Sequence, residues 1–268
     1  MNPFVFSCIT SHGTEIIPEL QGQSPERMSL TRRNMTEIGL EMEKAKPDAI
    51  IVLTPHGTRI AGQFSITDSE NMEGTIEEND IVFTLKRRVD RELARKIAEH
   101  ANELELPVGL INYATASGPY SSLSMDWGVM VPLRFMPNVP IVVINPTREL
   151  SYEKHLEFGK AVRNAVLTSN KKIGLVASCD WSHTHNENGP YGYHPAAQTL
   201  DEQVLQIVKQ NQLEKLQGFD EEFVEAAKPD GIWQALILAG AIPEEERHIK
   251  LRSYEAPTYF GLLCASIY

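Results

Sequence analysis

The chain has 268 residues, 42% of them hydrophobic, which is enough apolar material for one large core or two smaller ones. The net charge of −11 argues against nucleic acid or an anionic membrane as the main partner. Three cysteines without a CxxC pair argue against a disulfide framework and favour a reducing compartment.

The chain lacks the marks of several other classes. No basic region precedes a long apolar stretch at the N-terminus, so no signal peptide is expected. No apolar run approaches the roughly 20 residues that span a bilayer. No linker-like stretch or internal repeat divides the sequence. We therefore expect one domain over residues 1–268, no membrane partner and a cytoplasmic location.

Strand and helix patterns alternate through the first half of the chain. The run Phe4–Ile9 predicts a buried strand, and Ser24 followed by Pro25 predicts the start of a helix that ends before Pro47. The apolar run Ala49–Leu53 is typical of a strand buried on both faces. After it we expect weak strands over residues 64–85, a helix opened by Asp90, a strand over 108–111, and a helix over 126–135 that Pro132 kinks or ends.

The second half continues the alternation. We expect a buried strand over residues 141–144, a helix over 152–168 capped by Ser151, and a strand over 172–177. Thr199 and Glu202 fit a capping box at the start of a helix to about residue 212. The last expected elements are helices opened by Asp220 and Gly231, an edge strand over 249–254 and an apolar strand over 259–267. This order predicts an α/β fold, a single-domain α/β/α sandwich with a central, mostly parallel or mixed sheet.

Four polar side chains follow predicted strands at the point where each strand ends. His12 follows the first strand, His56 the second, His183 a later strand and Glu255 a strand near the end. Ligands collect outside the carboxyl ends of strands in open α/β sheets, so we expect these side chains to converge. Two histidines and one carboxylate leave open coordination positions on Fe(II), and Zn(II) accepts the same set. A single histidine at a loop start is more often an ordinary polar residue, so the hypothesis depends on the four matched positions.

Further candidates surround His183. Asp180 could orient His183 or His185, or could cap the turn that follows. His185 and the turn-rich loop that contains Tyr193 could border a pocket. Cys179 adjoins Asp180, but a buried thiol is its default interpretation.

An ordered set of short motifs resembles the class III extradiol ring-cleavage dioxygenases, the family of the catalytic subunit of protocatechuate 4,5-dioxygenase. The motifs cover nearly the whole chain in matching order, and they are Ser11-His12-Gly13, Pro55-His56-Gly57, Asp180-Trp181-Ser182-His183, Gly189–Tyr193 and Tyr254-Glu255-Ala256-Pro257. The resemblance implies that His12, His56 and Glu255 bind Fe(II) and that His183 is the acid/base histidine. It also implies cleavage of a catechol- or aminophenol-type ring with O₂. The ligand set admits Zn(II) or Mn(II) as well.

One segment departs from the family pattern. In Asp126–Leu133, Trp127 stands where many members carry a histidine near the substrate. This departure argues against a carboxylated catechol and favours a flatter or more apolar ring that could stack on the indole. We therefore expect a substrate pocket that includes Trp127, Asp180, His185 and Tyr193.

Two other functions fit the same residues. A zinc-dependent hydrolase could use the same three ligands, and a non-catalytic family member acting in interaction or signalling could keep an idle pocket. The intact set of four favours an enzyme whose partners are a small aromatic substrate and O₂. A homo-oligomer is expected on general grounds, and the resemblance also allows a separate small subunit.

Overall fold

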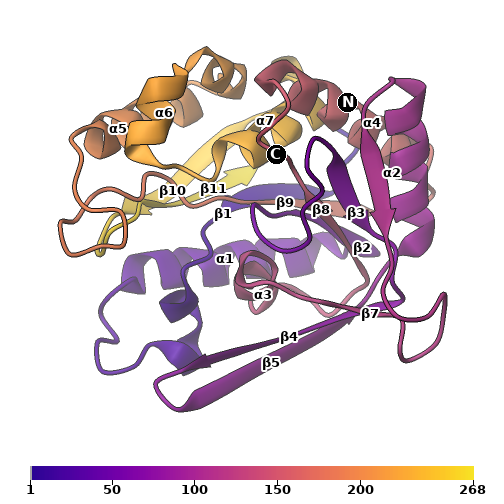
Figure 1. Cartoon of the computed structure of the whole chain (residues 1–268), viewed down its shortest axis with the longest axis horizontal. Coiled ribbons are helices and arrows are strands. Elements are labelled where there is room, and N and C mark those ends of the chain that lie inside the picture. Colours follow the sequence, from indigo (N-terminus) through magenta and orange to yellow (C-terminus); the bar gives the residue numbers. More distant parts are fainter. Residues whose placement is uncertain (1) are drawn as a thin grey trace.

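The computed structural model describes residues 2–268 and arranges them around an eight-stranded mixed sheet (Figure 1). Its strands are β1 Phe6–Thr10, β2 Ala49–Leu53, β3 Phe64–Thr67, β6 Val108–Ile111, β8 Ile141–Asn145, β9 Ile173–Ser178, β10 Ile249–Glu255 and β11 Leu262–Ile267. Their order is β10-β11-β1-β9-β2-β8-β3-β6. Strands β1, β9, β2 and β8 run parallel, whereas β11 is antiparallel to β1 and β10, and β3 is antiparallel to β8. The predicted α/β fold with a mixed central sheet is confirmed.

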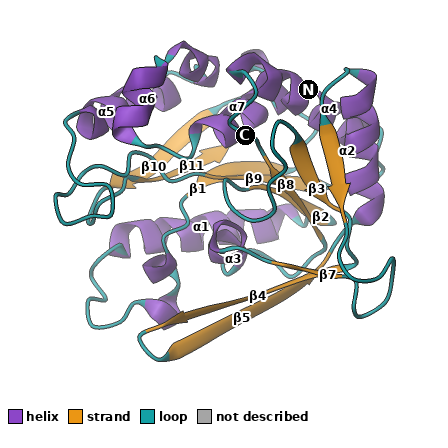
Figure 2. Ribbon diagram, in the orientation of Figure 1, coloured by secondary structure: helices purple, strands orange, loops and turns teal. Residues whose placement is uncertain are grey.

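Helices cover both faces of this sheet (Figure 2). They are α1 Ser29–Ala45, α2 Arg91–Glu103, α3 Trp127–Leu133, α4 Tyr152–Leu167, α5 Ala196–Lys209, α6 Glu221–Ala227 and α7 Ile232–Ala241. One buried apolar cluster joins one sheet face to α2, α4, α5 and α7, and a second joins the other face to α1 and α3. None of the helices in residues 2–268 combines the length and the apolar character needed to cross a membrane.

A second, three-stranded sheet lies on the same side as α1 and α3 (Figure 1). It contains β4 Asn71–Glu78, β5 Ile81–Arg88 and β7 Ser122–Ser124, in the order β5-β4-β7. The turn between β4 and β5 consists of Asn79 and Asp80, both with positive φ, at 53° and 61°. Asn and Asp tolerate this conformation, which two-residue hairpin turns of the primed types require. The extended pattern predicted for residues 64–85 is therefore confirmed, but it divides between two sheets.

The first helix begins later than predicted. Residues 24–28 form hydrogen-bonded turns, and Met28 has a left-handed φ of 59°, which interrupts any helix that starts earlier. As a result α1 begins at Ser29, and the start predicted at Ser24-Pro25 is wrong.

The predicted capping box is also wrong. Helix α5 begins at Ala196, three residues before Thr199, and the hydroxyl of Thr199 donates to the carbonyl of Pro195 inside the helix. A serine or threonine within a helix can bond back in this way to the carbonyl four residues earlier, although such residues are more favourable as caps. Three other predicted caps are confirmed, since side chains accept hydrogen bonds from first-turn amides at Asp90, Ser151 and Asp220.

The central strands position the site. Strands β1, β9 and β2 are adjacent, parallel and buried along their whole length. Because parallel strands end at the same edge of a sheet, the loops after Thr10, Ser178 and Leu53 leave the sheet side by side. These loops carry His12, the Asp180–His183 segment and His56.

Candidate metal centre

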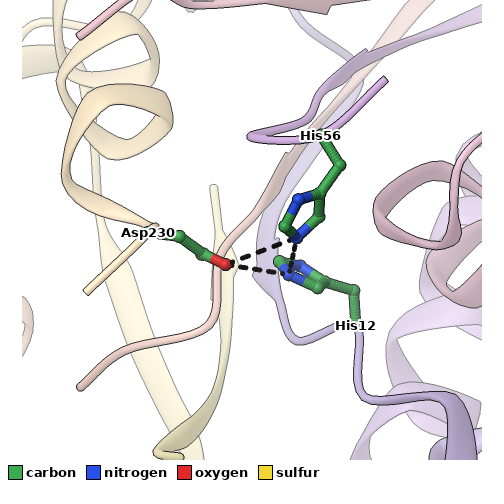
Figure 3. A group of neighbouring side chains, drawn as sticks. All are labelled: His12, His56 and Asp230. Atoms are coloured by element: carbon green, nitrogen blue, oxygen red, sulfur yellow. Dashed lines mark hydrogen bonds and ion pairs between the residues drawn. The ribbon is translucent and has the colours of Figure 1, made fainter. Parts of the chain in front are cut away.

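Two imidazoles and one carboxylate converge at this edge of the sheet (Figure 3). Nε2 of His12 lies 3.2 Å from Nε2 of His56 and 3.2 Å from Oδ2 of Asp230. Nε2 of His56 lies 3.5 Å from the same carboxylate oxygen. His12 follows β1, His56 follows β2, and Asp230 stands directly before Gly231, the N-cap of α7. The three ligand atoms lie within 4.8 Å of one another, so this group could hold a metal ion.

Hydrogen bonds behind His12 decide which of its nitrogens faces the group. Nδ1 lies 3.0 Å from the hydroxyl of Ser178, and that hydroxyl donates its hydrogen to the carbonyl of Gly128 at 2.6 Å. The Ser178 oxygen must therefore accept the Nδ1 hydrogen, which leaves Nε2 of the neutral ring with its lone pair toward His56 and Asp230. Metal-ligating histidines are oriented by bonds of this kind.

Asp230 is held by its neighbour Asp180. The backbone N–H of Asp180 donates to Oδ1 of Asp230 at 2.9 Å, which leaves Oδ2 for the two imidazoles. Oδ1 of Asp180 in turn accepts the backbone N–H of His12 at 3.0 Å. Asp180 therefore orients His12, and not His183 or His185 as the sequence suggested.

The buried carboxylates favour a cation at this position. Burial alone would lower the pKa of His12, but Asp180 and Asp230 outweigh it and raise that pKa to about 9. Burial alone would raise the pKa of Asp230, but the charge of His12 and its hydrogen bonds to His12 and His56 hold it well below the ordinary value. Two nitrogen lone pairs and a carboxylate oxygen at one point repel each other unless a proton or a metal lies between them. This donor set fits Fe(II), Zn(II) or Mn(II) with coordination positions left open.

His183 lies near the same carboxylate oxygen of Asp230. Its Nδ1 donates to the carbonyl of Lys228 at 2.8 Å, because a carbonyl can only accept. Nε2 of the neutral ring therefore carries a lone pair, and it lies 3.9 Å from Oδ2 of Asp230. The ring of His183 stacks on Phe260, with centroids 5.5 Å apart and planes 12° apart. A proton acceptor in a fixed orientation thus stands beside the candidate metal ligands.

A cavity of about 380 Å³ opens in front of the three histidines. Aromatic side chains form much of its wall, and they are Trp127, Tyr191, Tyr259 and Phe260. The ring of Trp127 lies against that of His56, with centroids 4.2 Å apart. The volume and the aromatic side chains of the wall suit a single small aromatic molecule.

The predicted pocket residues divide into two groups. Trp127 and Asp180 line this cavity. His185 and Tyr193 do not line it. Nε2 of His185 bonds to Oδ2 of Asp201 at 2.8 Å, and Tyr193, which pairs with His185 in a β-bridge, is exposed. Oδ2 of Asp201 also accepts the hydroxyl of Tyr254 at 2.6 Å, so His185 belongs to a buried hydrogen-bond network beside the site.

The structure brings Asp230 to the two imidazoles, where the sequence had suggested Glu255. Oε1 of Glu255 instead accepts the backbone N–H and the hydroxyl of Thr31 at 2.8 and 2.6 Å, in the first turn of α1. The sequence does not predict Asp230 as a ligand, because this residue precedes a helix and does not follow a strand. The only signal was an aspartate directly before Gly231, which the sequence had identified as a helix start.

The chain belongs to a family of aromatic ring-opening dioxygenases. Residues 7–262 match the family described as "Catalytic LigB subunit of aromatic ring-opening dioxygenase". The match covers nearly the whole chain and confirms the resemblance to the class III extradiol dioxygenases.

Individual relatives are distant. The chain is 26% identical over 249 residues to Protein CA_C1420 of Clostridium acetobutylicum, which covers 91% of this chain and 53% of that protein. It is 25% identical over 203 residues to the 2-aminophenol 1,6-dioxygenase beta subunit of Pseudomonas sp, covering 69% of this chain and 66% of that one. The chain thus spans about half the length of the first relative and about two thirds of the second. The crystal structure of the uncharacterized protein JW3007 from Escherichia coli K12 has the same fold, with a TM-score of 0.67 at 17% identity and coverage of 98% and 99% of the two chains.

Proposed function

We propose that the chain is an extradiol dioxygenase that opens the ring of a catechol- or 2-aminophenol-type aromatic with O₂, using Fe(II) held by His12, His56 and Asp230. The observation that carries the proposal is the convergence of these three side chains beside an aromatic-walled cavity, with Nε2 of His183 facing the same point. Family membership and the relative named as a 2-aminophenol dioxygenase subunit support it.

The proposed mechanism assigns separate roles to the metal and to the protein. Fe(II), when bound, would supply open positions for the substrate's two adjacent heteroatoms and for O₂, and would acidify the bound hydroxyl. His183 takes the substrate proton at Nε2, because its Nδ1 hydrogen already bonds to the Lys228 carbonyl. The imidazolium that forms faces Asp230, whose charge stabilises it. The same nitrogen later donates a proton as the O–O bond breaks.

Oxygen consumption tests the reaction class. The protein is loaded anaerobically with Fe(II) and mixed with catechol or 2-aminophenol, and O₂ uptake is followed together with the absorbance of the ring-opened product. We expect O₂ uptake that depends on both Fe(II) and substrate. A zinc-dependent hydrolase consumes no oxygen, so the absence of uptake with every catechol and aminophenol overturns the proposal.

We also propose that the chain acts in an assembly of subunits. The 2-aminophenol relative is named as a beta subunit, which supports a multi-subunit enzyme. The native mass of the purified chain, measured by sedimentation, separates a homo-oligomer from a single chain. If the chain is monomeric and gains activity only when a separate small subunit is added, the enzyme is an assembly of two different subunits.

A further inference from the structure

The cavity in front of the histidines is acidic. Its described lining contains three carboxylates, those of Glu15, Glu78 and Asp180, and no lysine or arginine. Asp180 is committed to His12, and Glu15 forms an ion pair with Arg27 at 2.7 Å. Glu78 differs from both, because within residues 2–268 no ion pair or hydrogen bond is described for its carboxylate. Its negative charge is therefore available to a molecule that enters the cavity.

The hairpin of β4 and β5 fixes where Glu78 stands. Glu78 is the last residue of β4 and pairs with Ile81 across the two-residue turn. This turn lies beside the loop between β1 and α1, since the side chain of Asn79 approaches Gly22. Successive side chains of a strand point to opposite faces. Glu78 is accordingly half-buried at the cavity, whereas its neighbour Glu77 is exposed and does not line it.

The other walls of the cavity suit a positive group as well. Trp127 and Tyr191 are the exposed aromatic side chains of the lining, 46% and 58% exposed. The faces of such rings attract ammonium groups. A substrate carboxylate, in contrast, is normally bound by arginine or lysine, and the described lining offers neither.

We propose that Glu78 makes the site select aromatic substrates that carry a positively charged side chain and reject those that carry a carboxylate. This inference rests on the proposed function and narrows it to one substrate class, catechols or aminophenols with an ammonium-bearing substituent. Glu78 acts by charge on the substituent of a substrate whose two ring heteroatoms face the candidate metal ligands.

Binding of three matched catechols tests this proposal without turnover. Protein loaded with Fe(II) is titrated anaerobically, by calorimetry, with dopamine, 4-ethylcatechol and dihydrocaffeate, whose side chains are positive, neutral and negative. We expect dopamine to bind at least about tenfold more tightly than dihydrocaffeate, with 4-ethylcatechol between them, because one unscreened charge at short range contributes about this much.

Two variants of the same hairpin separate charge from structure. Glu78→Gln is expected to lose most of the preference for dopamine while it keeps its affinity for 4-ethylcatechol. Glu77→Gln removes the same charge on the opposite face of β4 and is expected to keep the preference. Equal affinities in the unaltered protein, or a preference that survives in Glu78→Gln, overturn the proposal.

The outcomes also distinguish the two proposals from each other. Selective binding of dopamine without O₂ uptake refutes the dioxygenase and leaves the charge selection standing. Uptake of O₂ with all three catechols, bound at equal affinity, supports the dioxygenase and refutes the charge selection by Glu78. Failure of all three catechols and of the matching 2-aminophenols to bind overturns both.

Discussion

The carbonyl of Lys228 determines which nitrogen of His183 can react. It binds the Nδ1 hydrogen at 2.8 Å and so leaves Nε2 as the proton acceptor in the cavity. We predict that His183→Gln keeps its iron but loses about 10²- to 10⁴-fold in turnover, the usual contribution of a positioned acid/base group. Iron content by metal analysis and O₂ uptake with catechol measure the two effects. His100→Gln, on the outer helix α2, serves as the control, and unchanged turnover in His183→Gln would remove this residue from the mechanism.

Replacing Asp230 and replacing Glu255 should have opposite effects on metal binding. Asp230→Asn removes the negative oxygen that faces both imidazoles, so we expect its iron content to fall by at least about tenfold. Glu255→Gln weakens the bonds to Thr31 and leaves the two imidazoles untouched, so we expect full iron content and a loss of about 0.5–2 kcal/mol in the free energy of unfolding. Metal analysis of both variants after identical loading decides between them. The reverse result would make Glu255 the ligand that the family resemblance implied.

The layer formed by α4 and α7 holds the carboxylate that faces the histidines, because α7 begins one residue after Gly231 and two after Asp230. The two helices touch backbone to backbone at their glycines. A Cβ atom built on Gly240 would lie 2.0 Å from the carbonyl oxygen of Leu156, and one on Gly159 would lie 2.2 Å from that of Ile237. Neither oxygen can move without displacing a helix.

Gly240→Ala should therefore separate α4 from α7. We predict a loss of about 1–3 kcal/mol in the free energy of unfolding, the cost of overpacking a core contact, together with a lower iron content as Asp230 shifts. Gly218→Ala is the matched control, because a Cβ atom there meets nothing within 4 Å. Urea denaturation measures both variants, and equal stabilities would show that the helix pair adapts to the added methyl group.

The sequence predicted those helices and strands whose position depends on a local pattern of residues. Buried runs such as Ala49–Leu53 identified the central strands, and Asp90, Ser151 and Asp220 were recognised as caps because these residue types satisfy free amides at helix starts. It could not predict that β4 and β5 leave the main sheet, because an alternating pattern does not say which strand will be its partner.

The same limit applies to the site. His12, His56 and His183 could be predicted because strand ends of a parallel sheet meet at one edge. Asp230 could not, because an aspartate before a helix has the same local pattern whether it caps the helix or binds a metal. His185 and Tyr193 follow the right strand, but the chain turns His185 toward Asp201, a residue of α5 that no local pattern connects to it.

A histidine that folds in its uncharged state makes the stability of the whole molecule depend on pH. His155, in the first turn of α4, is completely buried. Its Nδ1 donates to the carbonyl of Ser151 at 2.8 Å, and the centroid of its ring lies 5.0 Å from that of Phe64. Burial lowers the pKa of His155 from 6.5 to about 4.

This lowered pKa predicts a loss of stability in mild acid. Between pH 6.5 and about 4 the unfolded chain binds a proton at His155 and the folded chain does not, so the contribution present above pH 6.5 is lost as the pH falls. The full difference corresponds to about 3 kcal/mol. Urea denaturation at pH 7 and pH 4.5 should show a smaller loss in His155→Gln than in the unaltered protein, whatever the starting stability of the variant. His248→Gln, which removes an exposed histidine, should keep the unaltered pH dependence. An identical pH dependence in His155→Gln would mean that other groups, and not the buried imidazole, govern unfolding in acid.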